Sequence, residues 1–258
     1  MLKKVFKMLI ISFVLLVILF CVYFLILQKP KVAVLTYHDI VENVDNPNTV
    51  NISVEKFEKQ IKWLHDNNYK ALTIDEYYEW KKNNKKIPRK SVLITFDDGW
   101  HSFYTKAVPI LEKYNMKASV FVIWKYSENC QNSGDKIYMN FDEIKDIIDN
   151  HKTMNILSHS YDLHEEEKAK SNNKEIYSDD MKIVRSLTEQ EIKYYAYPFG
   201  KANNEYISAL KENNYKLAFT FGPYAFSTKD DNDYLIPRIG LFESTKDWKF
   251  KIKMFLKL

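Results

Sequence analysis

The first 27 residues follow a different hydrophobic pattern from the rest of the chain. Residues 8–27 contain no charged side chain and are long enough to cross a bilayer core of roughly 30 Å as a helix. The run is longer than the core of a secretion signal, and no cleavage site of small residues follows it. We therefore predict an uncleaved transmembrane signal anchor at 8–27.

Positive charge on one side of this run predicts its orientation. Lys3, Lys4 and Lys7 precede it, so the positive-inside rule places residues 1–7 in the cytoplasm and everything after the anchor outside the cell. Residues 28–31 form a short linker, and a single domain is expected over 32–258. The predicted location is the cell membrane, with the domain on the extracellular side.

Beyond the linker, short apolar runs alternate with stretches of helical periodicity. Runs rich in β-branched and aromatic residues predict strands at 32–37, 70–72, 92–96, 118–124, 154–157, 194–197, 217–221 and 234–239. Spacing and capping residues predict helices that begin near Ser53, Thr73, Ser102, Asn140, Asn173, Asn203 and Ser244. Residues up to 51 and from 126 to 138 are expected to be loops. The last helix is expected to gather Trp248, Ile252 and Phe255 on one face.

Repeated alternation of strands and helices favours a parallel sheet, and at this length a closed or slightly open (β/α) barrel. An open, doubly wound sheet is the alternative, although no glycine-rich phosphate turn follows the first strand. Polar residues follow several predicted strands: His38, Asp97, Asp98, His159 and the turn at 198–200. In a barrel, the end at which these strands finish carries the active site.

The strand at 92–96 ends in two adjacent carboxylates. Consecutive strand residues point to opposite faces, so Asp97 and Asp98 are expected to differ in role, one binding a cation and the other facing a substrate. A strand-end Asp-Asp-Gly turn is the alternative.

Two histidines favour a metal site over a simple turn at Asp97 and Asp98. His159 and His164 are five residues apart, so their imidazoles can converge only if the chain turns back after the strand. One carboxylate with two imidazoles leaves coordination positions open, as in a catalytic divalent site. Histidines on a surface loop are the alternative for this pair alone.

The motifs Thr95-Phe96-Asp97-Asp98-Gly99 and Ser158-His159-Ser160, with His164, resemble those of polysaccharide deacetylases of carbohydrate esterase family four. The resemblance extends over roughly 32–240. It implies a distorted (β/α)7 barrel, Asp97 as general base, and Asp98, His159 and His164 as ligands of one divalent metal ion, usually zinc. The five-residue histidine spacing resembles the subgroup that deacetylates poly-β-1,6-N-acetylglucosamine in biofilms.

Members of that subgroup are circularly permuted, and their general-acid histidine lies near the start of the domain. Tyr37-His38 fits this position, which implies that His38 is the general acid. The turn after the strand at 194–197 resembles a third family motif, in which the backbone N–H of Phe199 would bind the oxyanion. Many members carry an arginine before this turn that orients the base, where this chain has Ala196 and Tyr197; Arg238 is a candidate replacement.

The net charge of the chain argues against one class of partner. The whole chain carries 38 basic and 34 acidic residues. Without the three cytoplasmic lysines, 35 basic and 34 acidic residues remain, and this near-neutral balance argues against a nucleic-acid-binding groove.

The two cysteines are not expected to form an intrachain disulfide. Cys21 lies in the apolar run, and Cys130 is the single cysteine outside it.

We therefore expect a metal-dependent N-deacetylase that releases acetate from an extracellular N-acetylglucosamine polymer, with poly-β-1,6-N-acetylglucosamine as the first choice. Peptidoglycan deacetylation and a catalytically inactive carbohydrate-binding domain are the alternatives. Trp100, Trp124, Tyr161 and Arg238 are candidate substrate contacts because they lie near predicted strand ends. A polysaccharide synthase complex is left open as a further partner.

Overall fold

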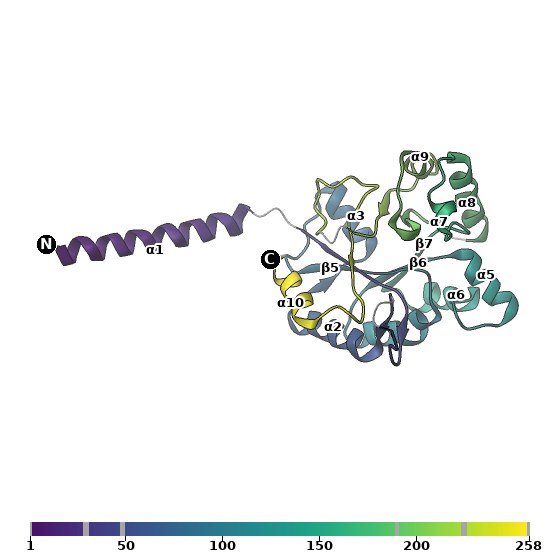
Figure 1. The fold of residues 1–258 in the computed structure, drawn as a ribbon, viewed down its shortest axis with the longest axis horizontal. Helices are drawn as coiled ribbons and strands as arrows, with labels where there is room; N and C mark the ends of the chain where they lie inside the picture. The colour runs from purple at the N-terminus through teal and green to yellow at the C-terminus, as the bar shows by residue number, and fades with distance from the viewer. Residues whose placement is uncertain (1, 28–30, 47–49, 189–190, 223–225, 257–258) are drawn as a thin grey trace.

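The structure is a computed structural model that describes residues 2–27, 31–46, 50–188, 191–222 and 226–256. Helix α1 (Leu2–Leu27) stands apart from one α/β domain (Figure 1). Its segment Lys4–Val22 is long and apolar enough to cross a membrane, and its side chains are exposed. The predicted apolar helix is therefore present as a candidate membrane span.

The domain alternates strands with helices. The strands are β1 (Ala33–Tyr37), β2 (Ile40–Val41), β3 (Ile52–Ser53), β4 (Lys70–Ala71), β5 (Ser91–Phe96), β6 (Ala118–Val122), β7 (Met154–Ser158), β8 (Tyr194–Ala196), β9 (Leu217–Phe219) and β10 (Ile239–Gly240). The helices are α2 (Val54–Asp66), α3 (Ile74–Asn83), the π-helix η1 (Phe103–Ala107), α4 (Val108–Lys113), α5 (Trp124–Ser133), α6 (Phe141–Asn150), α7 (Glu166–Ala169), α8 (Lys174–Leu187), the 3₁₀ turn η2 (Pro198–Gly200), α9 (Asn204–Glu212) and α10 (Asp247–Leu256).

The main sheet is parallel, in the order β10-β1-β5-β6-β7-β8-β9, with β4 beside the start of β5. Its two ends meet through the C-terminal segment. Ile236 forms a parallel bridge with Phe219 of β9, and three residues later Ile239 pairs with Leu35 of β1. The sheet thus curls into a distorted barrel, which confirms the predicted (β/α)7 class.

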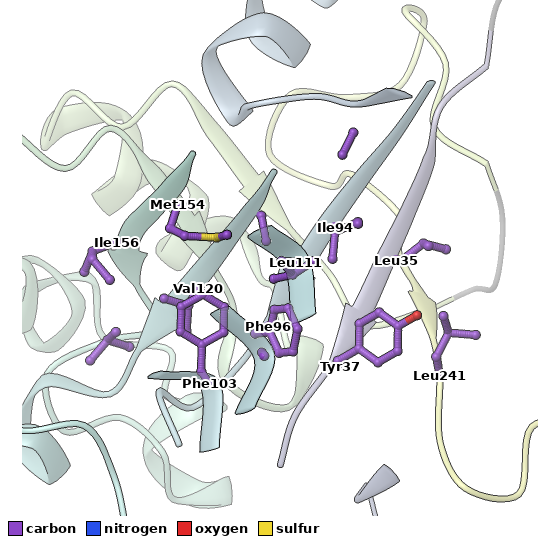
Figure 2. Packing of buried hydrophobic residues seen from close by; sticks show 14 of the residues in the cluster. Leu35, Tyr37, Ile94, Phe96, Phe103, Leu111, Val120, Met154, Ile156 and Leu241 are labelled. Atoms are coloured by element: carbon purple, nitrogen blue, oxygen red, sulfur yellow. The ribbon is translucent and has the colours of Figure 1, made fainter. Parts of the chain in front are cut away.

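Alternate strand residues build two apolar layers. Ile94 and Phe96 of β5 point outward and pack with Phe103 and Leu111 from the helices that follow (Figure 2). Leu93, which precedes Ile94 and points to the other face, belongs to a second cluster that joins inward-facing strand residues to α3. This two-residue period is what parallel strands covered on both faces require.

Local signals explain several helix starts. Thr73 with Glu76 and Asn140 with Glu143 form reciprocal capping boxes at α3 and α6, in the helices predicted to begin near Thr73 and Asn140. Pro109 lies in the first turn of α4, which directly follows the π-helix η1, so the helix predicted from Ser102 changes its hydrogen-bond pattern just before this proline.

Two segments predicted as loops contain regular structure. Residues 126–138 include most of α5, whose buried residues Trp124, Ser127 and Cys130 recur every three positions. Gly134 ends this helix with φ near 80°. Strands β2 and β3 lie in or next to the loop predicted up to 51, and they are too short to give an apolar pattern.

Two further predictions are corrected. Ser53 precedes α2 without capping it, because its hydroxyl donates to Glu243 instead. The last strand is reduced to Ile239–Gly240. Trp248, Ile252 and Phe255 share one face of α10 as predicted; this face is exposed, and Phe250 and Met254 make the contact with the domain.

Candidate active site and metal centre

The polar residues predicted to form the site lie together at the end of the barrel where the strands finish. His38 follows β1, Asp97 and Asp98 follow β5, and His159 follows β7. The backbone N–H of Asp97 donates to the carbonyl of Tyr37, so β5 stays paired with β1 up to the carboxylates. Parallel pairing therefore brings together residues that lie far apart in the sequence.

Asp98, His159 and His164 form a compact cluster of metal-ligand type. Asp98 Oδ1 lies 3.3 Å from His164 Nε2 and 3.5 Å from His159 Nε2, and the ligand atoms all lie within 4.8 Å of one another. Ligand atoms about 2.0 Å from one tetrahedral zinc ion would be about 3.3 Å apart. Asp98 Oδ1 is buried and has no hydrogen-bond partner among the described residues. The donor set and its spacing therefore fit a divalent cation.

Neighbouring groups orient these ligands. His159 Nδ1 lies 2.7 Å from the carbonyl of Ala196, which can only accept, so Nδ1 carries the proton and Nε2 keeps its lone pair. Burial lowers the pKa of His159 to about 4, so the imidazole is neutral at pH 7. The indole N–H of Trp100 donates to Asp98 Oδ2 at 3.0 Å, opposite the oxygen that faces the histidines.

Asp97 is held by an arginine rather than by the ligand cluster. Arg238 makes two parallel bonds to it, from Nη1 to Oδ1 at 2.6 Å and from Nη2 to Oδ2 at 2.7 Å, while its Nε donates to the carbonyl of Thr220. Burial opposes the charge on Asp97, but the Arg238 guanidinium holds the pKa of Asp97 below its usual value. His38 Nε2 lies 3.9 Å from Asp97 Oδ2, and its ring packs near Phe221 and Phe242.

Unusual backbone geometry is concentrated here. Seven non-glycine residues in the described part of the chain have positive φ; four are asparagines, and the other three are Asp98, Ser160 and Phe199. Asparagine tolerates this conformation, whereas strained residues of other types cluster at functional sites. Asp98 and Ser160 directly follow Asp97 and His159, so the chain bends as it leaves β5 and β7.

The loop between the two histidines is fixed by Asp180 of α8. Its carboxylate oxygens accept the backbone N–H groups of Tyr161 and Asp162, both at 2.8 Å. The side chain is 6% exposed, and burial raises the pKa of Asp180 to about 6. Asp180 was not among the predicted site residues, although an acid on an apolar helix face with Tyr177, Met181 and Val184 is a detectable signal.

The turn after β8 borders the cluster. The Phe199 ring is 44% exposed and stacks on His164 with centroids 4.5 Å apart. Gly200 has φ near 66°, and a Cβ there would lie 2.4 Å from the backbone nitrogen of Phe221. The turn therefore needs glycine at this position because β9 continues directly against it.

Two of the candidate substrate contacts are buried in this structure. Trp124 is 2% exposed and packs toward Phe141 from the start of α5. Arg238 is fully buried, precedes β10 and donates its guanidinium hydrogen bonds to Asp97. Trp100 and Tyr161 are partly exposed, and Tyr161 donates its hydroxyl to Glu128.

Comparison with known proteins shows the family of this chain. Residues 84–218 match the family model for polysaccharide deacetylases. A Staphylococcus aureus (strain MSSA476) poly-β-1,6-N-acetyl-D-glucosamine N-deacetylase is 33% identical over 202 residues, covering 73% of this chain and 67% of its own. Among solved structures, the Streptococcus pyogenes deacetylase PplD in complex with acetate superposes with a TM-score of 0.76 at 23% identity, covering 88% of this chain and 99% of its own. This chain belongs to the polysaccharide deacetylase family.

Proposed function

We propose that the domain at 32–258 is a metal-dependent N-deacetylase of poly-β-1,6-N-acetylglucosamine, tethered by α1 to the outer face of the cell membrane. The observation that carries the metal dependence is the unpartnered Asp98 Oδ1, which faces the Nε2 atoms of His159 and His164. A buried carboxylate oxygen is costly without a partner, and a cation is the partner that these donors suit.

The proposed residue roles follow from this arrangement. Asp98, His159 and His164 hold the metal, with zinc as the first choice. When bound, the cation would polarise the acetamide carbonyl and lower the pKa of a water molecule, which makes that water a better nucleophile at neutral pH. His164 is the most exposed of the three, with 21% of its side chain accessible, so substrate and water would reach the cluster from its side.

Proton transfer is assigned to the remaining polar pair. Asp97 is ionised at neutral pH and is held in one orientation by Arg238, so it can accept the proton of the attacking water. His38 is assigned to give a proton to the departing amine. The backbone N–H of Phe199 is assigned to the oxyanion, a donor whose loss costs about 10² to 10³ in turnover.

Two observations support the choice of polymer. The Staphylococcus aureus relative is named for poly-β-1,6-N-acetyl-D-glucosamine. The five-residue spacing of His159 and His164 is accommodated by the loop that Asp180 fixes, so the spacing is a structured feature of this site.

The test is acetate release by the full chain in detergent. β-1,6-linked N-acetylglucosamine oligomers and peptidoglycan are compared before and after chelation and after zinc is added back. We expect release from the oligomers, its loss on chelation and its return with zinc. Asp98→Asn should abolish release, whereas His65→Ala, at an exposed histidine of α2, should leave it unchanged.

The outcomes separate the proposals. Release from peptidoglycan alone replaces the polymer and keeps the mechanism. Release that is unaffected by chelation contradicts the metal assignment. No release from either polymer with any added divalent metal favours a carbohydrate-binding domain.

A further inference from the structure

Helix α10 carries an apolar stripe that no part of the described chain covers. Trp248, Ile252 and Phe255 recur at helical spacing and are 56%, 48% and 71% exposed. The opposite face of the helix, with Phe250 and Met254, is buried against the domain. The helix therefore has one apolar face that packs and a second that is free to meet another surface.

Positive charge accompanies this stripe. Residues 246–258 contain five lysines and one acid, whereas residues 28–245 contain 30 basic and 33 acidic residues. Lys249 and Lys251 lie on either side of the stripe on the helix surface and are exposed. The one acid, Asp247, is paired with Lys59 of α2. Aromatic and aliphatic side chains bordered by lysines suit the interface of an anionic bilayer.

The end of α10 lies at the rim of the barrel where α1 leads in. Tyr69, just before β4, donates its hydroxyl to the carbonyl of Met254. Strands β4 and β1 flank β5 at the same level, because Ala71 and Ala33 both pair with Val92. Neighbouring strands are about 4.8 Å apart, so the starts of β1 and β4 are only about 10 Å apart.

The short link to α1 keeps this rim near the membrane. Four peptide units separate Leu27 from Lys31, and fully extended they span about 14 Å. A bilayer crossed by α1 must therefore come close to the rim that carries the last turn of α10. Figure 1 shows α10 at the end of the domain that α1 approaches.

We infer that the stripe of α10 docks on the anionic lipid surface beside α1, as a second membrane contact of the domain. Trp248, Ile252 and Phe255 enter the interface, and Lys249 and Lys251 meet the headgroups. The metal cluster lies at the opposite end of strands that are five or six residues long, so docking holds the mouth of the barrel about 20 Å above the bilayer. The inference rests on the proposed membrane anchoring, not on the proposed polymer.

The test measures the depth of a spin label in the full chain, reconstituted in nanodiscs. With Cys21 and Cys130 replaced by alanine, a nitroxide is attached at Ile252→Cys or, as a control, at Ile176→Cys on α8. Ile176 is matched in exposure, at 44% against 48%, and lies on another helix. Collision rates with oxygen and with a water-soluble nickel chelate are compared in phosphatidylcholine discs with and without phosphatidylglycerol.

We expect the label at 252 to lose access to the nickel chelate and to keep access to oxygen in anionic discs, while the label at 176 stays open to both. Lys249→Glu with Lys251→Glu should restore nickel access at 252. Equal nickel access at 252 and 176 would overturn the inference. Shielding from both reagents with spin–spin broadening would also overturn it, since a second copy would then cover the stripe. The experiment does not measure deacetylase activity, so its result does not depend on whether the protein deacetylates the proposed polymer.

Discussion

Two adjacent aspartates have different partners because the backbone bends between them. Asp97 continues the inward-facing series of β5 and is bound by Arg238, whereas Asp98 has φ near 71° and faces two histidines. The alternation of a strand predicts that the two side chains diverge. It does not predict the left-handed bend or the partners, which come from β7, the loop after it and the segment before β10.

Trp100→Phe tests the group that orients Asp98, the proposed metal ligand. Removing the indole N–H leaves Asp98 Oδ2 without its 3.0 Å bond, so we expect metal affinity to fall by about 10- to 100-fold. Competition with a chelator measures the affinity. Trp124→Phe is the matched control because its indole nitrogen has no hydrogen-bond partner among the described residues. Equal affinities in the two variants would show that Trp100 does not position the ligand.

Arg238→Ala and Arg238→Lys test the orientation of the base. Lysine keeps the charge but cannot form the two parallel bonds to Asp97, so we expect turnover to fall by about 10²-fold in the lysine variant and further in the alanine variant. Removing one partner of a buried ion pair costs about 3 to 5 kcal/mol of stability, so thermal unfolding must be measured beside turnover. A folded lysine variant with normal turnover would exclude the proposed role.

At the scale of elements, the loops that follow the strands position the side chains of the candidate site. The capping boxes of α3 and α6 and the strands β1, β5 and β7 are set by local sequence, and their prediction is confirmed. The loop between His159 and His164 depends instead on Asp180, a contact 18 or 19 residues away in the sequence. Helix α5 was missed because its buried face includes Ser127 and is weakly apolar.

Gly200→Ala tests the turn that places Phe199. A methyl group there meets the Phe221 backbone at 2.4 Å, in addition to the strain of positive φ. We expect a loss of about 1 to 2 kcal/mol from the backbone and about 1 to 3 kcal/mol more from the clash. Gly134→Ala shares the positive φ but has nothing within 4 Å, so only the first loss is expected. Chemical denaturation of both variants measures the difference, and similar losses would contradict the steric argument.

Asp180→Asn tests the clamp on the histidine loop. The pKa of Asp180 is raised by burial to about 6 from an ordinary value of 3.8, so the folded protein binds an extra proton between these values. The stabilisation that this extra proton gives to the folded protein is fully present below pH 4 and is lost as pH rises through 6. The free energy of unfolding of the asparagine variant relative to the native protein should therefore rise by up to about 3 kcal/mol from pH 4 to pH 7.

Unfolding followed across this pH range measures the effect of Asp180. Ser178→Ala on the same helix is the control and should leave the pH dependence unchanged. A constant difference between the asparagine variant and the native protein would mean that Asp180 is ionised throughout, contrary to its burial.

Across the whole domain, a bound metal would link segments that are otherwise joined only by the sheet. Asp98 follows β5, and His159 and His164 follow β7, with β6 between them. Metal at 100-fold excess over its dissociation constant stabilises the folded state by about 2.7 kcal/mol. For a domain of this size that is about 5 to 10 °C in melting temperature, which chelation should remove. Asp98→Asn should melt at one temperature with and without chelator; a shift in that variant would place the metal elsewhere.

The order of residues along the chain was sufficient for the strand and helix alternation, the apolar N-terminal helix and the three residues, Asp98, His159 and His164, that the fold brings together, because these depend on local periodicity and on short motifs. The family resemblance named Arg238 as a candidate partner of the base, in agreement with its two hydrogen bonds to Asp97, but the sequence could not show how such distant groups are brought together. Arg238 reaches Asp97 across 141 positions, and Asp180 reaches the histidine loop from a separate helix. Such contacts depend on how the sheet curls and closes, and closure is a cooperative result of packing over the whole domain, so it leaves little trace in any single stretch of sequence.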